Sequence, residues 1–406
     1  MKISCDTSIL LNLKFNAYDY KKVTVPITCI EELDNLKTDE IRGYLARRAI
    51  NIIKDSNNIE KKLFTYCSNS NIFLEHKNDN RILSFALEVY KNDNETIFIT
   101  DDYSLYLKAE YLKLPCKLFE YDYSEIEAYT GIKEINIDSE KELDEDIYTN
   151  IYNLYPNQYL IATNSKDKKY LYMWNGEFLE SVKASSISNS YIKKKDSHNK
   201  ILPLDIYQRA FMHMLQNDNV KVKITDSIAG CGKSYLMIHW ALQMLEKKKY
   251  KKMFFIKSDS SPKNRKDFPA IPGGIDQKFS PFLGVIGDTV EENNILETLI
   301  SDGKLEIIPI NFVKGRSLKN IIFYINETQD FTPSEMKKLL SRLGEGSVAL
   351  LDGSTKQIDN KYCLYRNGLT AASENFKDKH NSAQVNMVED YRSELCKMVG
   401  QMDWHD

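Results

Sequence analysis

A loop of eight residues has the composition of a phosphate-binding turn. It comprises Ser227, Ile228, Ala229, Gly230, Cys231, Gly232, Lys233 and Ser234. Gly230 and Gly232 lack a Cβ, so the backbone can curve and direct several N–H groups toward one point. Lys233 can reach a β- or γ-phosphate, and the Ser234 hydroxyl suits Mg²⁺. The loop therefore predicts a Walker A site for ATP, with Ser227 where the full pattern has Gly or Ala.

The flanking residues favour this reading over a chance glycine-rich turn. Val222 and Ile224 alternate with two lysines, as in a half-buried strand, and apolar residues after Lys233 recur at helical spacing. A strand before the loop and a helix after it place the positive end of the helix dipole at the phosphate site.

Two further strands are expected to bring polar residues to the same site. The strand 320–325 ends in Asn326 and Glu327, an arrangement typical of a Walker B motif, although the first acid is replaced by an amide. Glu327 is expected to polarise the attacking water. After the strand 347–351, Gln357 could sense the γ-phosphate. Gln208 is either a reader of the adenine edge or an exposed helix residue.

Acidic residues in the first third of the chain follow predicted strands. Asp6 follows the strand 2–4, and Asp101 and Asp102 follow the strand 96–100. In open parallel sheets, ligands bind at the carboxyl ends of the strands. Carboxylates without histidine or cysteine suit Mg²⁺ or Mn²⁺, which can support attack on a phosphate. The alternative is that these acids only cap helices.

Composition describes an ordinary folded chain. Its 406 residues predict two or three domains, and its seven scattered cysteines indicate reduced thiols rather than a disulfide frame or zinc site. There is no long apolar run and no signal-peptide pattern, so a cytoplasmic location is expected. The net charge is −3. Nucleic-acid contact would therefore depend on local basic runs such as 247–252, which are more often solvated surface.

The N-terminal motifs together resemble a PIN-domain nuclease of the branch that is joined to PhoH-type ATPases. The matching stretches are 5–10, 25–37, 79–83 and 100–109. The resemblance implies a metal site formed by Asp6, Glu32, Asp79 and Asp102, of which Asp6 and Asp102 are expected to be catalytic. Glu31 and Asp101 are neighbours that one register step would exchange with them.

The C-terminal half resembles the PhoH ATPases, which are RecA-like and related to superfamily 1 helicase motors. Matching segments include 313–320, 331–336, 343–347 and 388–392. Arg392 lies where an arginine could meet phosphate in the same subunit or a neighbour. The chain departs from the family at Asn326 and at Ser354, where the family has Asp. A homo-oligomeric, hexameric ring is implied by the resemblance alone.

These inferences predict an α/β chain in three parts. Residues 1–132 would form a PIN-like parallel-sheet domain, 133–200 a linker with a small β-rich insert, and 201–406 a RecA-like P-loop NTPase domain. The expected function is a metal-dependent ribonuclease coupled to an ATP-driven motor, with ATP, Mg²⁺ or Mn²⁺, and single-stranded RNA as ligands. Two alternatives stay open: a nucleotide-switched binding module with weak ATPase, and a motor with an inactive PIN scaffold.

Overall fold

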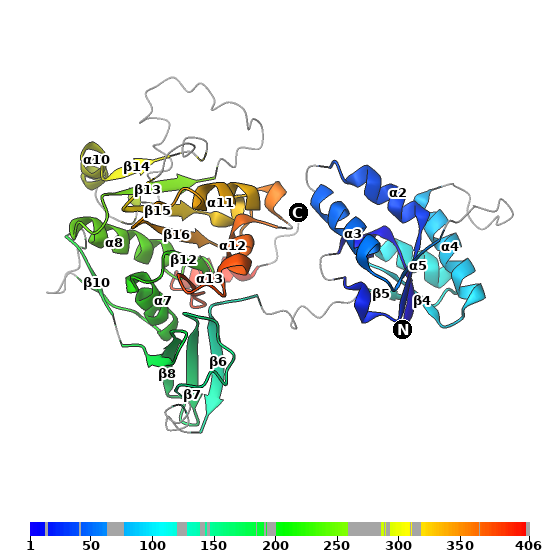
Figure 1. The fold of residues 1–406 in the computed structure, drawn as a ribbon, viewed down its shortest axis with the longest axis horizontal. Coiled ribbons are helices and arrows are strands. Elements are labelled where there is room, and N and C mark those ends of the chain that lie inside the picture. The colour runs from blue at the N-terminus through cyan, green and yellow to red at the C-terminus, as the bar shows by residue number, and fades with distance from the viewer. Residues whose placement is uncertain are drawn as a thin grey trace, which may run out of the picture. The chain divides into compact units, whose positions relative to one another are not determined.

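A computed structural model gives the fold as two compact units, residues 1–127 and 128–406 (Figure 1). The structure describes residues 1–12, 15–39, 42–62, 77–119, 128–138, 143, 147–183, 185–190, 192, 200–258, 286–287, 289, 293–308, 310, 318–364 and 366–402. Each unit is described by itself below.

The first unit is built on a five-stranded parallel sheet of order β3-β2-β1-β4-β5. The strands are β1 (Lys2–Cys5), β2 (Lys22–Pro26), β3 (Ile59–Lys62), β4 (Thr96–Thr100) and β5 (Cys116–Leu118). The helices are α1 (Thr7–Leu11), α2 (Ile27–Leu36), α3 (Gly43–Asp55), α4 (Asn78–Asn92) and α5 (Tyr103–Tyr111), with the 3-10 turn η1 (Ala17–Asp19). Parallel strands require such crossover helices.

The central strand of this sheet explains where the acids lie. In β1 and β4 the residues are almost entirely buried, because helices cover both faces of a parallel sheet. β1 pairs with both β2 and β4, and its last residue Cys5 lies opposite Ile99. The residues that follow β1 and β4, among them Asp6 and Asp102, therefore lie at the same edge of the sheet.

The second unit contains a six-stranded parallel sheet of order β14-β13-β15-β16-β12-β17. Its strands are β12 (Val222–Asp226), β13 (Lys252–Lys257), β14 (Leu305–Ile307), β15 (Ile321–Asn326), β16 (Val348–Gly353) and β17 (Ser382–Gln384). The helices are α7 (Ile206–Gln216), α8 (Lys233–Glu246), α10 (Asn293–Ser301), α11 (Pro333–Leu340), α12 (Gly368–Phe376) and α13 (Glu394–Gln401), with 3-10 turns η3 (Thr328–Asp330) and η4 (Lys361–Cys363).

Two apolar cores hold this sheet, one on each face. Buried residues of α7 and α8, among them Phe211 and Trp240, pack on one face. Residues of α11 and α12, among them Leu339 and Leu369, pack on the other. The arrangement fixes the carboxyl ends of β12, β15 and β16 side by side, which is where an α/β sheet binds ligands.

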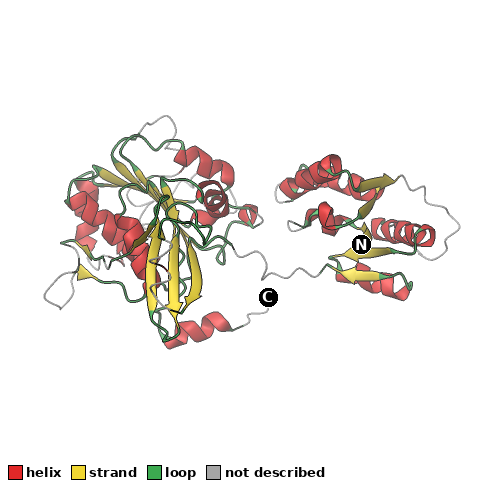
Figure 2. Cartoon of the chain, turned by 60° about the horizontal axis from the view of Figure 1, so that its bottom comes forward, coloured by secondary structure: helices red, strands yellow, loops and turns green. Residues whose placement is uncertain are grey.

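A smaller sheet of order β6-β7-β8-β9 precedes the large one in sequence. Figure 2, in which the bottom of Figure 1 comes forward, shows its strands in yellow. They are β6 (Ile132–Ile137), β7 (Tyr159–Asn164), β8 (Lys169–Trp174) and β9 (Leu179–Ser181), and the short pair β10 (Ile187–Ser188) and β11 (Lys200–Ile201) follows.

The small sheet is not a separate linker in this structure. Tyr159 and Ile161 belong to the same core cluster as Phe211 of α7, whereas Leu160 and Ala162 face a cluster of their own. β6 also begins at Ile132, before the boundary expected between residues 132 and 133. Of residues 185–200, at the end of the predicted linker, the structure describes 185–190, 192 and 200.

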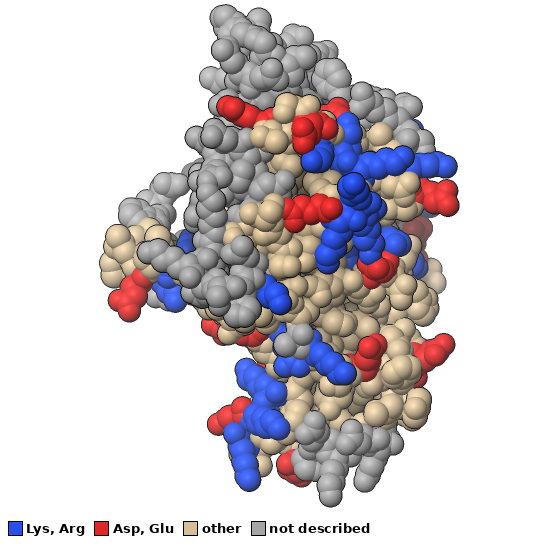
Figure 3. All heavy atoms as spheres, turned by 90° about the vertical axis from the view of Figure 1, so that its left-hand side faces the viewer, with Lys and Arg blue, Asp and Glu red and all other residues tan. Residues whose placement is uncertain are grey.

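The basic run after α8 carries a mixed charge. Figure 3 shows Lys and Arg side chains on one face with Asp and Glu side chains among them. Lys249 pairs with Asp218, and Lys252 pairs with Glu306 at 3.0 Å. The run is thus no uniformly positive patch. Within the described part of the chain, no helix is both long and apolar enough to cross a membrane.

Candidate functional site

The glycine-bearing loop connects the end of β12 to the start of α8. Gly230 and Gly232 have φ angles of 81° and 87°, in the left-handed region where a Cβ is disfavoured. Gly232 is the N-cap of α8, so Lys233 is the first residue of that helix. The loop therefore places its backbone amides and the helix N-terminus where a phosphate group binds.

Ser227, the departure at the start of the loop, is accommodated by its surroundings. Its hydroxyl is buried, pairs with the Thr225 hydroxyl at 2.5 Å and accepts the Met387 amide at 2.7 Å. The extra oxygen is therefore satisfied within the protein and ties the loop to the segment after β17. Ile228 and Ala229 are half-buried next to it.

Gln208 is a buried residue of α7. It is only 4% exposed, so it is not an exposed helix residue. Its amide nitrogen donates to the Cys231 carbonyl at 3.0 Å, and its amide oxygen accepts the Leu204 amide at 3.0 Å. Gln208 therefore contacts the glycine loop at the buried Cys231, and its reading of the adenine edge stays a prediction.

Asp352, which was not among the predicted site residues, lies beside the helix start. The Ser234 hydroxyl donates to Asp352 Oδ2 at 2.6 Å, and the Tyr324 hydroxyl donates to the same oxygen at 2.5 Å. Asn326 Nδ2 lies 3.3 Å from it. The acid is thus on β16, whereas the sequence pattern directed attention to the end of β15.

Glu327 has the strained backbone that is common at functional sites. Its φ and ψ are both 52°, a left-handed conformation that costs a non-glycine residue free energy. Gln329 Nε2 donates to Glu327 Oε2 at 2.7 Å and to the Gln357 carbonyl at 2.7 Å. Gln329 Oε1 accepts the Ser354 amide at 3.0 Å. Gln329, a residue the sequence did not single out, therefore connects Glu327 to the loop that carries Gln357.

Arg392 lies against the glycine loop of its own chain. The Tyr391 amide donates to the Gly230 carbonyl at 3.0 Å, and the Arg392 guanidinium pairs with Asp390 at 2.7 Å. The pKa of Asp390 is lowered to about 2, chiefly by its hydrogen bond from the Arg392 side chain. The guanidinium is therefore close to the phosphate loop and paired with a local acid.

Replacing Gly230 by alanine is expected to disrupt this contact. A Cβ there would lie 2.2 Å from Asp390 Oδ1 and 2.6 Å from Arg392 Cγ, and the φ angle alone costs about 1 kcal/mol. We expect ADP affinity, measured by calorimetry, to fall at least about tenfold.

Gly303→Ala is the matched control, because Gly303 also has a positive φ of 66° but nothing lies within 4 Å of its Cβ position. It should lose stability and keep its ADP affinity. Equal ADP affinities for both variants would contradict the role given to the contact.

In the first unit, Asp6 and Asp102 are joined through Thr100. The Thr100 hydroxyl donates to Asp6 Oδ2 at 2.9 Å and accepts the Asp102 amide at 3.0 Å. Asp6 is the N-cap of α1 and accepts from Ser8 and Ile9, while Asp102 is the N-cap of α5. Both acids therefore cap helices, as the alternative reading holds, and they also lie at one sheet edge.

The other two predicted acids are arranged less tightly. Glu32 accepts a hydrogen bond from the hydroxyl of Thr7, which follows Asp6. Asp79 lies 3.5 Å from the Lys108 ammonium, on α5. Across the described residues, no three acidic, histidine or cysteine side chains form a group that could hold a metal as they stand. The structure thus joins Asp6 to Asp102 through Thr100 and does not link Asp79 to either of them within the described residues, although an all-carboxylate set is chemically suited to Mg²⁺ or Mn²⁺.

The neighbours at the same edge make different contacts. Glu31 lies 3.8 Å from Arg81, and Asp101 accepts from Asn12 at 3.0 Å. Asp101 is exposed, whereas Asp6 is 4% exposed. Burial therefore separates Asp6 from an ordinary surface acid.

Burial raises the pKa of Asp6 to about 6 from an ordinary 3.8, against the opposing effect of its hydrogen bonds. Because the folded-state pKa is the higher one, protonated Asp6 stabilises the fold below about pH 4, and this stabilisation is lost as the pH rises through 6. In EDTA, the contribution of Asp6 to the free energy of unfolding should fall by about 3 kcal/mol between about pH 4 and a pH above 6. Asp6→Asn should lack this component in denaturant unfolding measured across pH. Identical pH slopes for the two proteins would contradict it.

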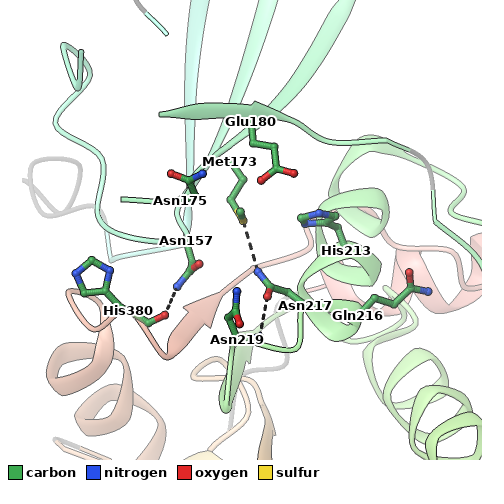
Figure 4. A pocket seen from close by; sticks show the side chains of 9 residues that line it. All are labelled: Asn157, Met173, Asn175, Glu180, His213, Gln216, Asn217, Asn219 and His380. Atoms are coloured by element: carbon green, nitrogen blue, oxygen red, sulfur yellow. Dashed lines mark hydrogen bonds between the residues drawn. The ribbon is translucent and has the colours of Figure 1, made fainter. Parts of the chain in front are cut away.

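A pocket of about 660 Å³ lies in the second unit between the small sheet and α7 (Figure 4). Its lining is mostly uncharged and polar: Asn157, Met173, Asn175, Glu180, His213, Gln216, Asn217, Asn219 and His380. Burial lowers the pKa of His213, whose Nδ1 lies 2.9 Å from the Tyr159 hydroxyl. A neutral imidazole among amides offers both donors and acceptors.

Comparisons with known proteins agree with this division of the chain. The family model for PhoH-like proteins matches residues 200–402, and the model for a PIN domain matches residues 4–120. "Protein PhoH2" of Bacillus subtilis is 25% identical over 98% of both chains. "Protein PhoH2" of Mycolicibacterium smegmatis is 23% identical over 98% of this chain and 95% of its own.

A further relative covers about half of this chain. A "PhoH-like protein" of Synechocystis is 29% identical over 47% of this chain and 58% of its own length. The full-length similarity to the PhoH2 proteins therefore includes the PIN domain as well as the P-loop domain. The match to the PhoH-like model spans half of the sequence, and the chain belongs to the PhoH family of P-loop ATPases, with a PIN domain of the usually nucleolytic class at its N-terminus.

Proposed function

We propose that this protein hydrolyses ATP and uses the cycle to deliver single-stranded RNA to a metal-dependent nuclease site in its PIN domain. The observation that carries the proposal is the placement of Lys233, Ser234 and Glu327 around one sheet edge in a chain whose other unit is a PIN domain. Because the P-loop domain and the PIN domain are on one polypeptide, we expect ATP hydrolysis in the first to be coupled to RNA cleavage in the second.

In the ATPase site, Lys233 would bind the β- and γ-phosphates and the loop amides would hold them in place. Glu327 would orient the attacking water, held by its hydrogen bond from Gln329. Ser234 would contribute a hydroxyl to Mg²⁺, and the bound ion would neutralise phosphate charge. Arg392 is already at the loop, and its release from Asp390 would let it reach the phosphates of its own or a neighbouring subunit.

In the nuclease site, Asp6, Glu32, Asp79 and Asp102 would hold Mg²⁺ or Mn²⁺. A bound divalent ion would supply activation of water and charge neutralisation at the scissile phosphate. Asp6 and Asp102 are the best-positioned members, because Thr100 fixes both of them. Asp79 would have to leave its ion pair with Lys108 to bind the cation. That ion pair is half-exposed and therefore weak.

RNA is the proposed partner, and the amide-lined pocket supports it. Asparagine and glutamine side chains pair with base edges, and single-stranded RNA exposes those edges. No lysine or arginine lines the pocket among the described residues, so a base suits it better than a phosphate. The hexameric ring implied by the family resemblance is likewise part of the proposal.

A second candidate is a nucleotide-switched RNA-binding module with little turnover. The uncharged Asn326 favours it, because an amide binds a cation less strongly than a carboxylate. Steady-state phosphate release separates the two. Multiple turnovers that increase with single-stranded RNA support the motor, and ADP binding without turnover supports the switch.

A further inference from the structure

The end of β15 lacks the charge that its position calls for. Asn326 is 3% exposed, and its carbonyl oxygen Oδ1 has no hydrogen-bond partner among the described residues. Its Nδ2 group lies 3.3 Å from Asp352 Oδ2. The amide is thus oriented by the neighbouring acid, with its own oxygen left unpaired.

Asp352 lies one strand across the sheet. β15 and β16 run parallel with Ile325 opposite Leu351, so Asn326 and Asp352 are the next residues along the two strands. On its other side, Asp352 lies opposite Thr225 in β12, which leads directly into the glycine loop. The sheet register therefore places this acid between the Walker B strand and the Walker A strand.

The two oxygens of Asp352 are in contrasting environments. Oδ2 accepts from Ser234 at 2.6 Å and from Tyr324 at 2.5 Å, with Asn326 at 3.3 Å, while Oδ1 has no partner within the described chain. The residue is 1% exposed, and no lysine or arginine in the described residues forms an ion pair with it. Leaving a buried acceptor unpaired costs roughly 1–3 kcal/mol, more if it is charged.

The unpaired atoms share one chemical character. Asp352 Oδ1 and Asn326 Oδ1 are buried oxygens, and the Ser234 hydroxyl that hydrogen-bonds to Asp352 is the third oxygen at this place. Three oxygen donors with one net negative charge form the kind of ligand set that Mg²⁺ takes together with nucleotide phosphates and water. A divalent cation held by these groups would give a buried oxygen the partner that it lacks.

We infer that Asp352 supplies the anionic oxygen for the divalent cation of the nucleotide site, in place of Asn326. The negative charge that Asn326 lacks at the end of β15 would then come from the neighbouring strand β16. This inference rests on the proposed binding of ATP. It explains how an amide at the Walker B position is compatible with a cation-dependent ATPase.

The test is ADP affinity of the full chain by calorimetry, in Mg²⁺ and in EDTA. Wild type should bind ADP about tenfold tighter with Mg²⁺, and Asp352→Asn should lose this difference while its affinity in EDTA is kept. The exchange variant Asn326→Asp/Asp352→Asn should restore the difference. Tyr324→Phe removes a hydrogen bond to Asp352 but leaves the Asp352 charge in place. This variant should therefore keep the difference in ADP affinity between Mg²⁺ and EDTA.

A second variant covers the case in which Asp352→Asn does not fold. Asn326→Asp places two buried carboxylates side by side, so its melting temperature should fall in EDTA and recover with Mn²⁺ and ADP. Cation-dependent ADP binding in Asp352→Asn, or no recovery of Asn326→Asp with Mn²⁺, would overturn the inference. If wild type bound no ADP in either buffer, the proposed ATP site itself would be wrong, which is a different result.

Discussion

Lys233→Ala is expected to reduce the rate constant of ATP hydrolysis by about 10²–10³-fold, because a positioned cation at the transferring phosphate is a large part of this catalysis. Lys233 is the first residue of α8, and its ammonium makes a long 3.5 Å contact with the Ile228 carbonyl. No ion pair in the described residues occupies it, so its charge is available to a phosphate. The measurement is phosphate release at saturating ATP.

The control is Lys247→Ala, at the opposite end of the same helix. Lys247 is exposed and far along α8 from the loop, so this variant loses one lysine without affecting the phosphate site. Both proteins should keep the wild-type melting temperature. Similar hydrolysis rates for Lys233→Ala and wild type would remove Lys233 from the mechanism.

Asp102→Asn is expected to lower cleavage of labelled single-stranded RNA in Mn²⁺ by at least about 10²-fold, through loss of a metal-binding carboxylate. The substitution is informative because asparagine is as good an N-cap as aspartate. Asp102 Oδ1 accepts the Ser104 and Leu105 amides at 2.7 and 3.2 Å, and an asparagine oxygen can accept the same bonds. The helix α5 should therefore keep its start while the charge is lost.

Asp101→Asn is the matched control, since it removes the same charge one residue earlier. Asp101 is exposed and, within the described residues, accepts from the Asn12 side chain and from no helix amide. It should keep the cleavage rate within about twofold. If Asp101→Asn lost cleavage and Asp102→Asn kept it, the metal-binding acid would be Asp101 and not Asp102. Equal cleavage by all three proteins would leave the PIN domain as a scaffold.

Much of the architecture follows from local pattern. The apolar strand predicted at 96–100 has the same bounds in the structure, and those predicted at 320–325 and 347–351 are shifted by one residue or extended by up to two. Each is a short, buried, mainly apolar run in a parallel sheet, which is the strongest signal that such strands give. The P-loop was equally readable, since its glycines, lysine and serine are consecutive.

The features that could not be predicted depend on contacts between distant segments. Asp352 lies 118 residues from Ser234, and only the register of β12, β15 and β16 brings them together. The sequence shows an acid at the end of a predicted strand, but it does not show that the Asp352 side chain contacts Ser234.

The contacts of Gln208 could not be predicted for a similar reason. A position on a helix does not reveal that the side chain donates to the Cys231 carbonyl inside the glycine loop. The contact between the small sheet and α7 is of the same kind, because Tyr159 pairs with His213. Both are hydrogen bonds between elements far apart in sequence.

The most direct test of the central claim uses one RNA with a single-stranded tail and a stable hairpin. If ATP turnover delivers RNA to the PIN domain, wild type in Mn²⁺ should cut the tail with or without ATP and cut within the hairpin only when ATP is hydrolysed. The same cuts at the same rates in the presence and absence of ATP would contradict a coupled machine.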